Sequence, residues 1–282
     1  MPVVDRVILI LMNDDWIEPA VWHGGGDSVI VVAADTTSLS ERFQPRREIR
    51  TDAVLSLDDD FRPTEEQLSS IVETWQVFRS SIVGPMWLAT RHTSCAAWSS
   101  SSSSSATLES WSEQGTYKCR RWAYGTGGWA GYYNLLLTGF AVFHRGLLPL
   151  YWSNSTRAHS MRNFVEGARN CEDIAMNFVA GDATGQAGVA VDVGVILEYE
   201  SLGGISQQAG HYSVRHGCVS DFARDLYGGN IPLVNCTIGS PHRTVHHAFA
   251  TSADARAEAQ SIGWSQGKVS VLEDAWAAWL AS

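Results

Sequence analysis

The sequence predicts an α/β protein in which the strands of a parallel sheet alternate with helices. Three apolar, β-compatible runs lie at residues 3–12, 28–33 and 53–57, separated by about 15 to 20 residues of polar or helix-forming sequence. Beyond Thr64, apolar residues recur three and four positions apart, which indicates an amphipathic helix. We therefore expect the strand at 53–57 to be buried within a parallel sheet.

Further elements follow from local patterns. The run Thr64-Glu-Glu-Gln67 is a helix-start signal. We expect further strands at 82–84, 135–144 and 189–200, a short helix within 36–48 and a helix over 215–227. The strand at 135–144 contains Thr138-Gly139, and a glycine within a strand marks a bulge or a close backbone approach.

Composition and charge exclude several classes of protein. The chain has 282 residues, of which 45% are hydrophobic, enough to bury a sizeable core. Its formal net charge is −10 and it has no basic stripe, which argues against a nucleic-acid partner held by counterion release. The N-terminal apolar run, Val7 to Met12, is too short for a membrane helix, and nothing else approaches that length, so we expect a soluble chain.

The cysteines and glycosylation sequons carry little information by themselves. The five cysteines are Cys95, Cys119, Cys171, Cys218 and Cys236. None forms a Cys-x-x-Cys pair and no histidine spacing completes a zinc site, so the count fits one or two disulfides with a free thiol, or none. Sequons at Asn154 and Asn235 favour the secretory pathway only weakly, because such tripeptides often arise by chance.

The strand at 53–57 runs directly into three acids, Asp58, Asp59 and Asp60. Adjacent carboxylates repel one another, and a divalent cation such as Mg²⁺ or Mn²⁺ relieves that repulsion. Ligands of open α/β sheets bind at the carboxyl ends of strands, which agrees with a metal site here. A solvated acidic turn explains the stretch about equally well when it is considered alone.

A second chemical focus is the run Asn170-Cys-Glu-Asp-Ile-Ala-Met-Asn-Phe178. Its apolar residues recur at helical spacing, and Asn170 is the expected N-cap. Glu172 and Asp173 then lie in the first turn, where the helix dipole favours carboxylates. Ordinary capping therefore explains both acids when the segment is considered alone.

Three other segments are of lower complexity or unusual composition. Residues 99–105 are an unbroken serine run, which we expect to be a surface insertion. Residues 117–133 are rich in aromatics and glycines; these suit the apolar face of a sugar ring, although core packing explains most tryptophans equally well. We expect residues 237–282 to be an appendage with one amphipathic helix.

In their order along the chain, these motifs resemble glycosyltransferase family 64, the C-terminal catalytic domain of the exostosins and their plant relatives. The matching runs are residues 49–60, Ile82-Val-Gly84, Leu137-Thr-Gly139, Asn170-Cys-Glu-Asp-Ile-Ala-Met-Asn177, and Arg215-x-x-Cys218 followed by Ile231-Pro-Leu233. Many metal-dependent transferases share an aspartate-tipped strand. The Asn-Cys-Glu-Asp-Ile-Ala-Met-Asn run at this distance from it is far more specific.

The resemblance implies a fold, a reaction and a compartment. It implies a GT-A fold, a Rossmann-like nucleotide-sugar-binding domain over residues 1–236, N-terminally short because the family's usual first strand is not supplied. It implies Mn²⁺-dependent, retaining transfer of an N-acetylhexosamine from a UDP-sugar to a glycan or glycolipid acceptor, and it allows a homodimer. It also implies the lumen of the Golgi or endoplasmic reticulum, although this chain carries no membrane anchor.

On the donor side, the resemblance implies roles for five residues. Asp58, Asp59 and Asp60 match the metal and nucleotide-sugar motif, and Asp60 is the implied metal ligand. Arg42 matches a donor-site arginine, and Glu172 is placed with the donor-binding residues.

Around the reacting carbon, the resemblance implies two catalytic residues. Asp173 matches the acid beneath the transferred sugar, acting as nucleophile or as electrostatic partner, and Arg215 matches the arginine that faces the diphosphate. Arg91 and Asn170 are implied on the acceptor side, and a disulfide is implied between Cys171 and Cys218.

One departure from the family leaves a second hypothesis open. Thr37 stands where relatives usually carry a nucleotide-contacting asparagine, and together with the short N-terminus it allows an inactive sugar- or nucleotide-binding protein. A third hypothesis, a phosphoryl transferase, needs a phosphate-binding glycine loop with lysine, and the sequence has none.

Overall fold

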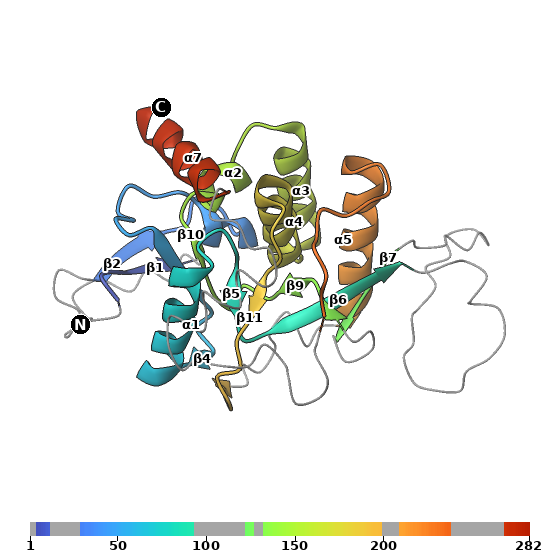
Figure 1. The fold of residues 1–282 in the computed structure, drawn as a ribbon. Helices are drawn as coiled ribbons and strands as arrows, with labels where there is room; N and C mark the ends of the chain where they lie inside the picture. Colours follow the sequence, from blue (N-terminus) through green and yellow to red (C-terminus); the bar gives the residue numbers. More distant parts are fainter. Residues whose placement is uncertain (1–3, 12–28, 93–121, 127–131, 199–208, 238–267) are drawn as a thin grey trace, which may run out of the picture.

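The chain is a mixed α/β protein in the computed structural model, which describes residues 4–11, 29–92, 122–126, 132–198, 209–237 and 268–282. Most helices gather on one side of several small sheets (Figure 1). The serine run, residues 117–121 and 127–131 of the aromatic segment and most of the tail lie outside the described residues, as do Cys95 and Cys119. In the part of the chain that the structure describes, no helix is long and apolar enough to cross a bilayer.

The elements have the following bounds. The strands are β1 (Val7–Leu11), β2 (Val29–Ala33), β3 (Ala53–Leu57), β4 (Phe61–Arg62), β5 (Val83–Gly84), β6 (Trp87–His92), β7 (Trp122–Thr126), β8 (Tyr132–Tyr133), β9 (Leu135–Leu136), β10 (Phe140–His144), β11 (Val189–Ala190), β12 (Leu197–Glu198) and β13 (Cys236–Thr237). The helices are the 3₁₀ helix η3 (Leu39–Phe43), α1 (Glu65–Val77), α2 (Leu147–Tyr151), α3 (Thr156–Ala168), α4 (Glu172–Thr184), α5 (His211–Leu226) and α7 (Val269–Ala281).

The central sheet has the strand order β11-β5-β10-β3. Its edge strand β3 pairs antiparallel with β10, from Ala53 opposite His144 to Leu57 opposite Phe140. Only Ser56 of the five β3 residues is buried. The expectation of a strand buried in a parallel sheet is therefore wrong, because β10, which is fully buried, takes the interior position and leaves β3 at the edge.

The strand spacing predicted the relation between β1 and β2 correctly. These two strands pair in parallel, with Val7 opposite Val29 and Leu11 opposite Ala33. They form a sheet of their own, however, and do not continue into the sheet that contains β3. Apolar runs of this length predict strands, but they do not specify which strands become neighbours.

Strand β10 separates two cores, because its side chains alternate between the faces of the central sheet. Ala141 and Phe143 join the larger core, which contains the buried faces of α2, α3, α4 and α5. Phe140 and Val142 join a smaller core with Ile71 and other residues of α1. The site described below lies on the side of the larger core.

Helix α1 begins where the sequence predicted. Thr64 is the N-cap, its hydroxyl accepts the Gln67 backbone N–H at 3.3 Å, and the Gln67 side chain accepts the Thr64 backbone N–H at 2.9 Å. The Gln67 amide also donates to the Val193 and Val195 carbonyls, over 3.0 and 2.9 Å. The cap thus fixes α1 and the chain beyond β11 at the same time.

Residues 189–200 do not form the single strand that we expected. The structure has two short strands there, β11 and β12, which pair with β5 and β4 in different sheets. Gly194 lies between them with a φ of 72°, a conformation that interrupts an extended strand. The apolar run continues across this position, so the hydrophobic pattern did not reveal the break.

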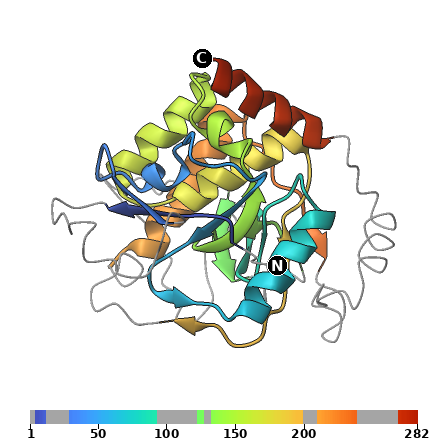
Figure 2. The same cartoon turned by 90° about the vertical axis from the view of Figure 1, so that its left-hand side faces the viewer.

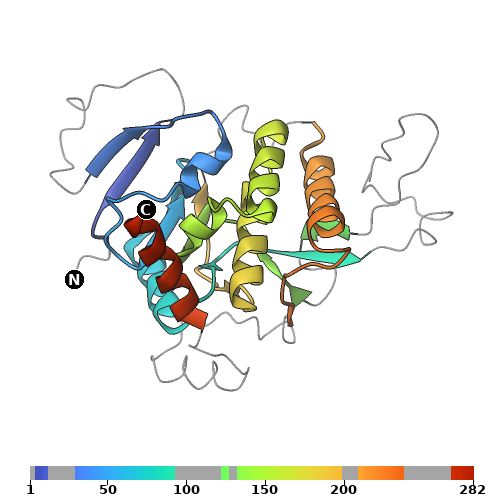
Figure 3. The ribbon, with the colours of Figure 1, turned by 90° about the horizontal axis from the view of Figure 1, so that it is seen from above.

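Helix α7 lies along the helical side of the molecule, against α2 and α4 (Figures 2 and 3). Leu272 and Trp276 enter the larger core, and the Leu272 carbonyl packs directly on the backbone of Gly146. The guanidinium of Arg145 lies 5.1 Å from the Trp276 ring centroid, within cation–π distance. These contacts make α7 part of the packed body of the protein.

Candidate active site

The candidate active site lies where β3 ends and where η3 and the starts of α4 and α5 approach one another. Asp58 follows β3 directly, and its backbone N–H donates to the Gly139 carbonyl over 2.7 Å. Gly139 precedes β10, so the strand-end acid is held by the turn at Thr138-Gly139, where we expected a break in the strand. That glycine is the close backbone approach which the sequence indicated.

Arg42 joins the two acidic motifs. It forms an ion pair with Asp58, and its Nη1 lies 3.5 Å from Oε1 of Glu172. Its neighbour Phe43 is buried against Tyr151, with the two ring centroids 5.0 Å apart. This packing fixes η3, so Arg42 is held in position between Asp58 and Glu172.

Glu172 has an altered affinity for protons. Burial, and then the neighbouring charge of Asp173, raise the pKa of Glu172 above its ordinary value. The guanidinium groups of Arg42 and Arg215 oppose this shift. Glu172 therefore takes up a proton more readily than an exposed glutamate does.

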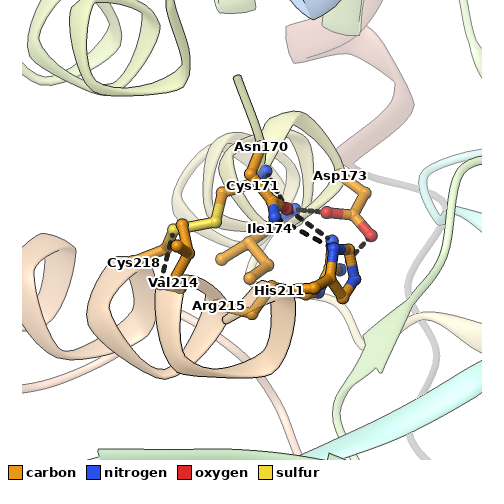
Figure 4. The surroundings of a disulfide bond; sticks show 8 residues. All are labelled: Asn170, Cys171, Asp173, Ile174, His211, Val214, Arg215 and Cys218. Atoms are coloured by element: carbon orange, nitrogen blue, oxygen red, sulfur yellow. Dashed lines mark hydrogen bonds and ion pairs between the residues drawn. A yellow bond between two sulfur atoms is a disulfide. The ribbon is translucent and has the colours of Figure 1, made fainter. Parts of the chain in front are cut away.

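Asp173 and Arg215 form a buried ion pair between α4 and α5 (Figure 4). The two residues are only 4% and 5% exposed, so each charge depends on the other for compensation. Burial disfavours the charged guanidinium, but the charges of Asp173, Tyr124 and Glu172 and the hydrogen bond to Asp173 together outweigh it, so the pKa of Arg215 is raised. The Arg215 guanidinium also lies 4.5 Å from the Tyr124 ring centroid, a cation–π contact.

The start of α4 differs from the predicted cap. Cys171, with a φ of 76°, occupies the N-cap position, and Asn170 lies one residue before it. The Asn170 side chain accepts the Cys171 backbone N–H over 2.8 Å and an Arg215 Nη1–H over 3.1 Å. Asn170 is thus not the N-cap, because the disulfide-bonded Cys171 occupies this position and the Asn170 amide oxygen accepts from Arg215 of the buried pair instead.

The disulfide implied by the resemblance is present. Cys171 and Cys218 are joined, with their Cα atoms 6.4 Å apart and a sequence separation of 47. The bond connects the start of α4 to α5 beside Asp173 and Arg215 (Figure 4). Covalent and ionic contacts therefore hold the same two helices together.

Hydrogen bonds of the Asn177 side chain also hold α4 to the neighbouring sheet. The Asn177 side chain accepts the Leu136 backbone N–H over 3.0 Å and donates to the Leu136 carbonyl over 2.7 Å. It also donates to the carbonyl of Asp173 over 2.8 Å. The first turn of α4, which carries Asp173, is therefore tied to β9.

The three strand-end acids have different surroundings. Asp58 is paired with Arg42, Asp59 is exposed, and Oδ1 of Asp60 is buried without a hydrogen-bond partner among the described residues. Within those residues, no group of three or more His, Cys, Asp or Glu side chains could by itself hold a metal ion. Asp60 therefore offers a buried carboxylate oxygen without a hydrogen-bond partner among the described residues, which fits a hard cation that takes its remaining ligands from substrate phosphates and water.

The structure brings most of the predicted site residues together. Arg42, Asp58 and Glu172 form one linked group, and Asn170, Asp173 and Arg215 form the other. The two groups meet at the adjacent positions 172 and 173. Arg91 lies on β6, but its side chain is outside the described part of the structure, so its acceptor role stays a prediction.

Sequence reasoning missed several residues that shape this site. His211 precedes the helix that we expected over 215–227, but it is the first residue of α5. His211, Arg215 and Cys218 follow the i, i+4, i+7 spacing of one helix face, and each contacts residues at the start of α4. From that spacing, the start of the predicted helix could have been placed at His211. Tyr124 gave no signal that separated it from other core aromatics.

Strand-end acids facing a buried carboxylate and two arginines, on an α/β framework, suit the transfer of a group from a phosphorylated donor. The family model for the "Glycosyl transferase family 64 domain" matches residues 1–240. The chain therefore belongs to glycosyltransferase family 64.

Individual relatives agree with this assignment. Exostosin-1 of Mus musculus is 31% identical over 235 residues, which is 81% of this chain and 28% of the relative. Exostosin-1b of Danio rerio is 30% identical over 236 residues, with the same coverage. Glycosylinositol phosphorylceramide mannosyl transferase 1 of Arabidopsis thaliana is 33% identical over 200 residues, which is 70% of this chain and 52% of the relative. The chain thus spans only 28% of the exostosin relatives and about half of the plant enzyme.

Proposed function

We propose that this chain is a retaining, Mn²⁺-dependent glycosyltransferase with a GT-A fold, which moves an N-acetylhexosamine from a UDP-sugar to a glycan or glycolipid acceptor. The observation that carries the proposal is the buried Asp173–Arg215 pair, joined through Glu172 and Arg42 to the acidic end of β3. A cap or a packing contact needs no such chain of charges.

The donor is bound on the β3 side. Asp58 and Arg42 contact the nucleotide sugar, because their half-buried charged groups can exchange their mutual pairing for contacts with a ligand. Asp59 and Glu172 complete the donor-binding set. The arginines supply the positive charge that a chain with a net charge of −10 needs locally to attract an anionic donor.

Asp60 is the residue that would hold the metal. Its buried, unpartnered Oδ1 is a suitable ligand for Mn²⁺, and the donor diphosphate would supply further oxygens. When bound, the metal neutralises negative charge on the departing diphosphate.

Asp173 and Arg215 act on opposite charges in the reaction. The Asp173 carboxylate stabilises the positive charge that develops at the reacting sugar carbon, as carboxylates do in glycosidases. The Arg215 guanidinium stabilises the negative charge of the leaving diphosphate. Their pairing orients both groups before the donor binds, so little reorganisation is needed during transfer.

The acceptor enters on the side of Asn170 and Arg91. Asn170 is 5% exposed and, among the described residues, uses one of its two amide N–H groups, which leaves the other for an acceptor hydroxyl. Transfer to a glycolipid fits the name of one relative, glycosylinositol phosphorylceramide mannosyl transferase 1.

The disulfide supports a location in the secretory pathway. A buried disulfide that joins two helices of the site persists in an oxidising compartment, such as the lumen of the endoplasmic reticulum or the Golgi.

Release of the nucleotide from a panel of nucleotide sugars tests the proposal. We expect Mn²⁺-dependent release of UDP from a UDP-N-acetylhexosamine, accelerated by a glycan acceptor, and a product that keeps the donor's anomeric configuration in NMR spectra. The panel includes a mannose nucleotide because of the plant relative. UDP binding without release from any donor would instead support the alternative, an inactive sugar- or nucleotide-binding protein.

A further inference from the structure

The side chains of Asn170 and His211 form a hydrogen-bonded pair next to the buried Asp173–Arg215 ion pair. Nδ2 of Asn170 is 3.1 Å from Nδ1 of His211, and Oδ1 of Asn170 accepts from Nη1 of Arg215 over 3.1 Å. Arg215 in turn pairs with Asp173 through Nη2. The four side chains therefore form a continuous path from His211 to the carboxylate of Asp173 (Figure 4).

The path defines which atoms donate. Oδ1 of Asn170 accepts both the Cys171 backbone N–H and the Arg215 guanidinium, so the amide nitrogen is the end that faces His211. An amide nitrogen only donates, and Nδ1 of His211 must therefore accept. The imidazole of His211 is thus neutral and carries its proton on Nε2.

This arrangement fixes the Asn170 amide in one orientation. A flipped amide would turn its NH₂ group toward Arg215 and toward the Cys171 N–H, placing donors against donors. His211 favours the observed orientation because its Nδ1 accepts only from the nitrogen end. His211 and Arg215 are four residues apart on α5, so one helix face presents the imidazole and the guanidinium to the same amide.

We propose that Asn170 and His211 are a positioning pair for Arg215. His211 holds the Asn170 amide, and Asn170 holds one nitrogen of the guanidinium so that another faces Asp173. The inference rests on the proposed function, in which Arg215 faces the donor diphosphate, and it assigns both residues a role in orienting that arginine. Neither contact is needed for the fold of α4 and α5, because the disulfide and the core packing already join these helices.

Two substitutions of His211 separate positioning from other roles. His211→Leu removes the acceptor, whereas His211→Asn keeps one, because Oδ1 of asparagine lies where Nδ1 of histidine does. A misplaced catalytic group commonly costs about tenfold to a hundredfold in rate. We expect a loss of that size in kcat for His211→Leu, with little change in KM for the donor, and recovery of most of the rate in His211→Asn.

A matched control lies on α3. Asn163 and His159 form the same kind of pair, with Nδ2 and Nδ1 3.2 Å apart, but exposed and within one helix. His159→Leu removes an equivalent hydrogen bond away from the site and leaves kcat unchanged. The inference is overturned if His211→Leu turns over like the wild type, or if His211→Asn is as impaired as His211→Leu at equal folded fraction.

A readout that needs no turnover keeps this inference separate from the proposed function. The ¹⁵N chemical shifts of the His211 ring report its tautomer in the folded protein. A neutral ring protonated on Nε2, with protonation passing to Nδ1 in a fraction of molecules in Asn170→Ala, supports the pair. A wild-type ring protonated on Nδ1 overturns it, whether or not the protein is active. If the tautomer is as expected but no donor is turned over, the proposed function fails and the hydrogen-bonded arrangement stands.

Discussion

The backbone of Gly139 lies directly against the carboxylate of Asp58. A Cβ atom at position 139 would lie 2.6 Å from Oδ2 of Asp58, closer than real Cβ contacts allow. The Asp58 backbone N–H meanwhile donates to the Gly139 carbonyl over 2.7 Å. The absence of a side chain at position 139 is therefore a condition for the observed position of Asp58.

The first prediction follows from this contact. Gly139→Ala should displace the Asp58 carboxylate, disturb its pairing with Arg42 and weaken Mn²⁺-dependent UDP binding by about tenfold, a loss of about 1.4 kcal/mol. Isothermal titration calorimetry measures the change. Gly167→Ala is the matched control, because a Cβ at position 167 meets nothing within 4 Å and helix α3 should gain about 0.5–1 kcal/mol. Unchanged UDP affinity in Gly139→Ala contradicts the prediction.

The second prediction concerns the metal. Asp60→Ala should abolish the Mn²⁺ dependence of UDP binding and leave the melting temperature unchanged, since Oδ1 of Asp60 has no hydrogen-bond partner among the described residues. Asp274→Ala, an exposed substitution on α7, is the control for a lost negative charge. Retention of Mn²⁺-dependent binding by Asp60→Ala would exclude Asp60 as the ligand.

The third prediction separates catalysis from stability at Asp173. Asp173→Asn should lower turnover strongly with little change in donor affinity, because the lost charge acts mainly in the transition state. It should also lower the free energy of unfolding by about 3 kcal/mol, because Arg215 would keep a buried charge without a partner. If Asp173 only capped the helix, Asp173→Asn would lower the free energy of unfolding by less than about 1 kcal/mol and would leave turnover nearly normal.

A double variant tests the reason for that instability. In Asp173→Asn combined with Arg215→Gln, the buried positive charge is absent, so part of the lost stability should return while turnover stays low. Urea denaturation and donor turnover measure the two effects. Additive losses of stability in the double variant would show that the two residues act independently.

The fourth prediction concerns the disulfide. Opening the Cys171–Cys218 bond, which closes a loop of 47 residues, should lower the free energy of unfolding by about 4 kcal/mol in the chain-entropy model. Cys218→Ser should reproduce the effect of reduction. Cys236→Ser is the matched control, because Cys236 is a free thiol. Peptide mapping that finds Cys171 and Cys218 unpaired in the native protein would contradict the structure here.

The fifth prediction is a pH dependence of stability that arises from His144. Burial lowers the pKa of His144 from 6.5 to about 4, and its Nε2 has no hydrogen-bond partner among the described residues. Between pH 6.5 and pH 4 the unfolded chain therefore binds a proton that the folded protein excludes. The contribution of neutral His144 to the free energy of unfolding is fully present above pH 6.5. It decreases as the pH falls, by up to about 3 kcal/mol at pH 4.

His144→Asn isolates this contribution. Oδ1 of asparagine can still accept the Gly146 N–H that Nδ1 of His144 accepts at 3.0 Å, but the side chain no longer titrates. The variant should be less stable at pH 7, because the ring packing on Trp75 is lost, and its stability should fall less between pH 6.5 and pH 4. Equal slopes for variant and wild type in denaturation curves across this range would rule out His144 as the source.

The sequence by itself determined the features that depend on neighbouring residues. The capping box at Thr64, the break at Thr138-Gly139 and the acids that follow β3 were all readable, because caps, turns and strand ends depend on residues within a few positions of one another. The motif resemblance determined the family and implied the Cys171–Cys218 pairing. Local chemistry and motif order therefore sufficed for most of the elements and for the approximate site.

Only the tertiary structure decided how these pieces meet. It placed β3 antiparallel at a sheet edge, and it paired Asp173 with Arg215 across 42 residues. It also moved Asn170 from a cap to the support of that pair and extended α5 back to His211. Such contacts depend on which helix and strand faces pack together, and packing free energy is spread over many distant residues, so no short stretch of sequence specifies them.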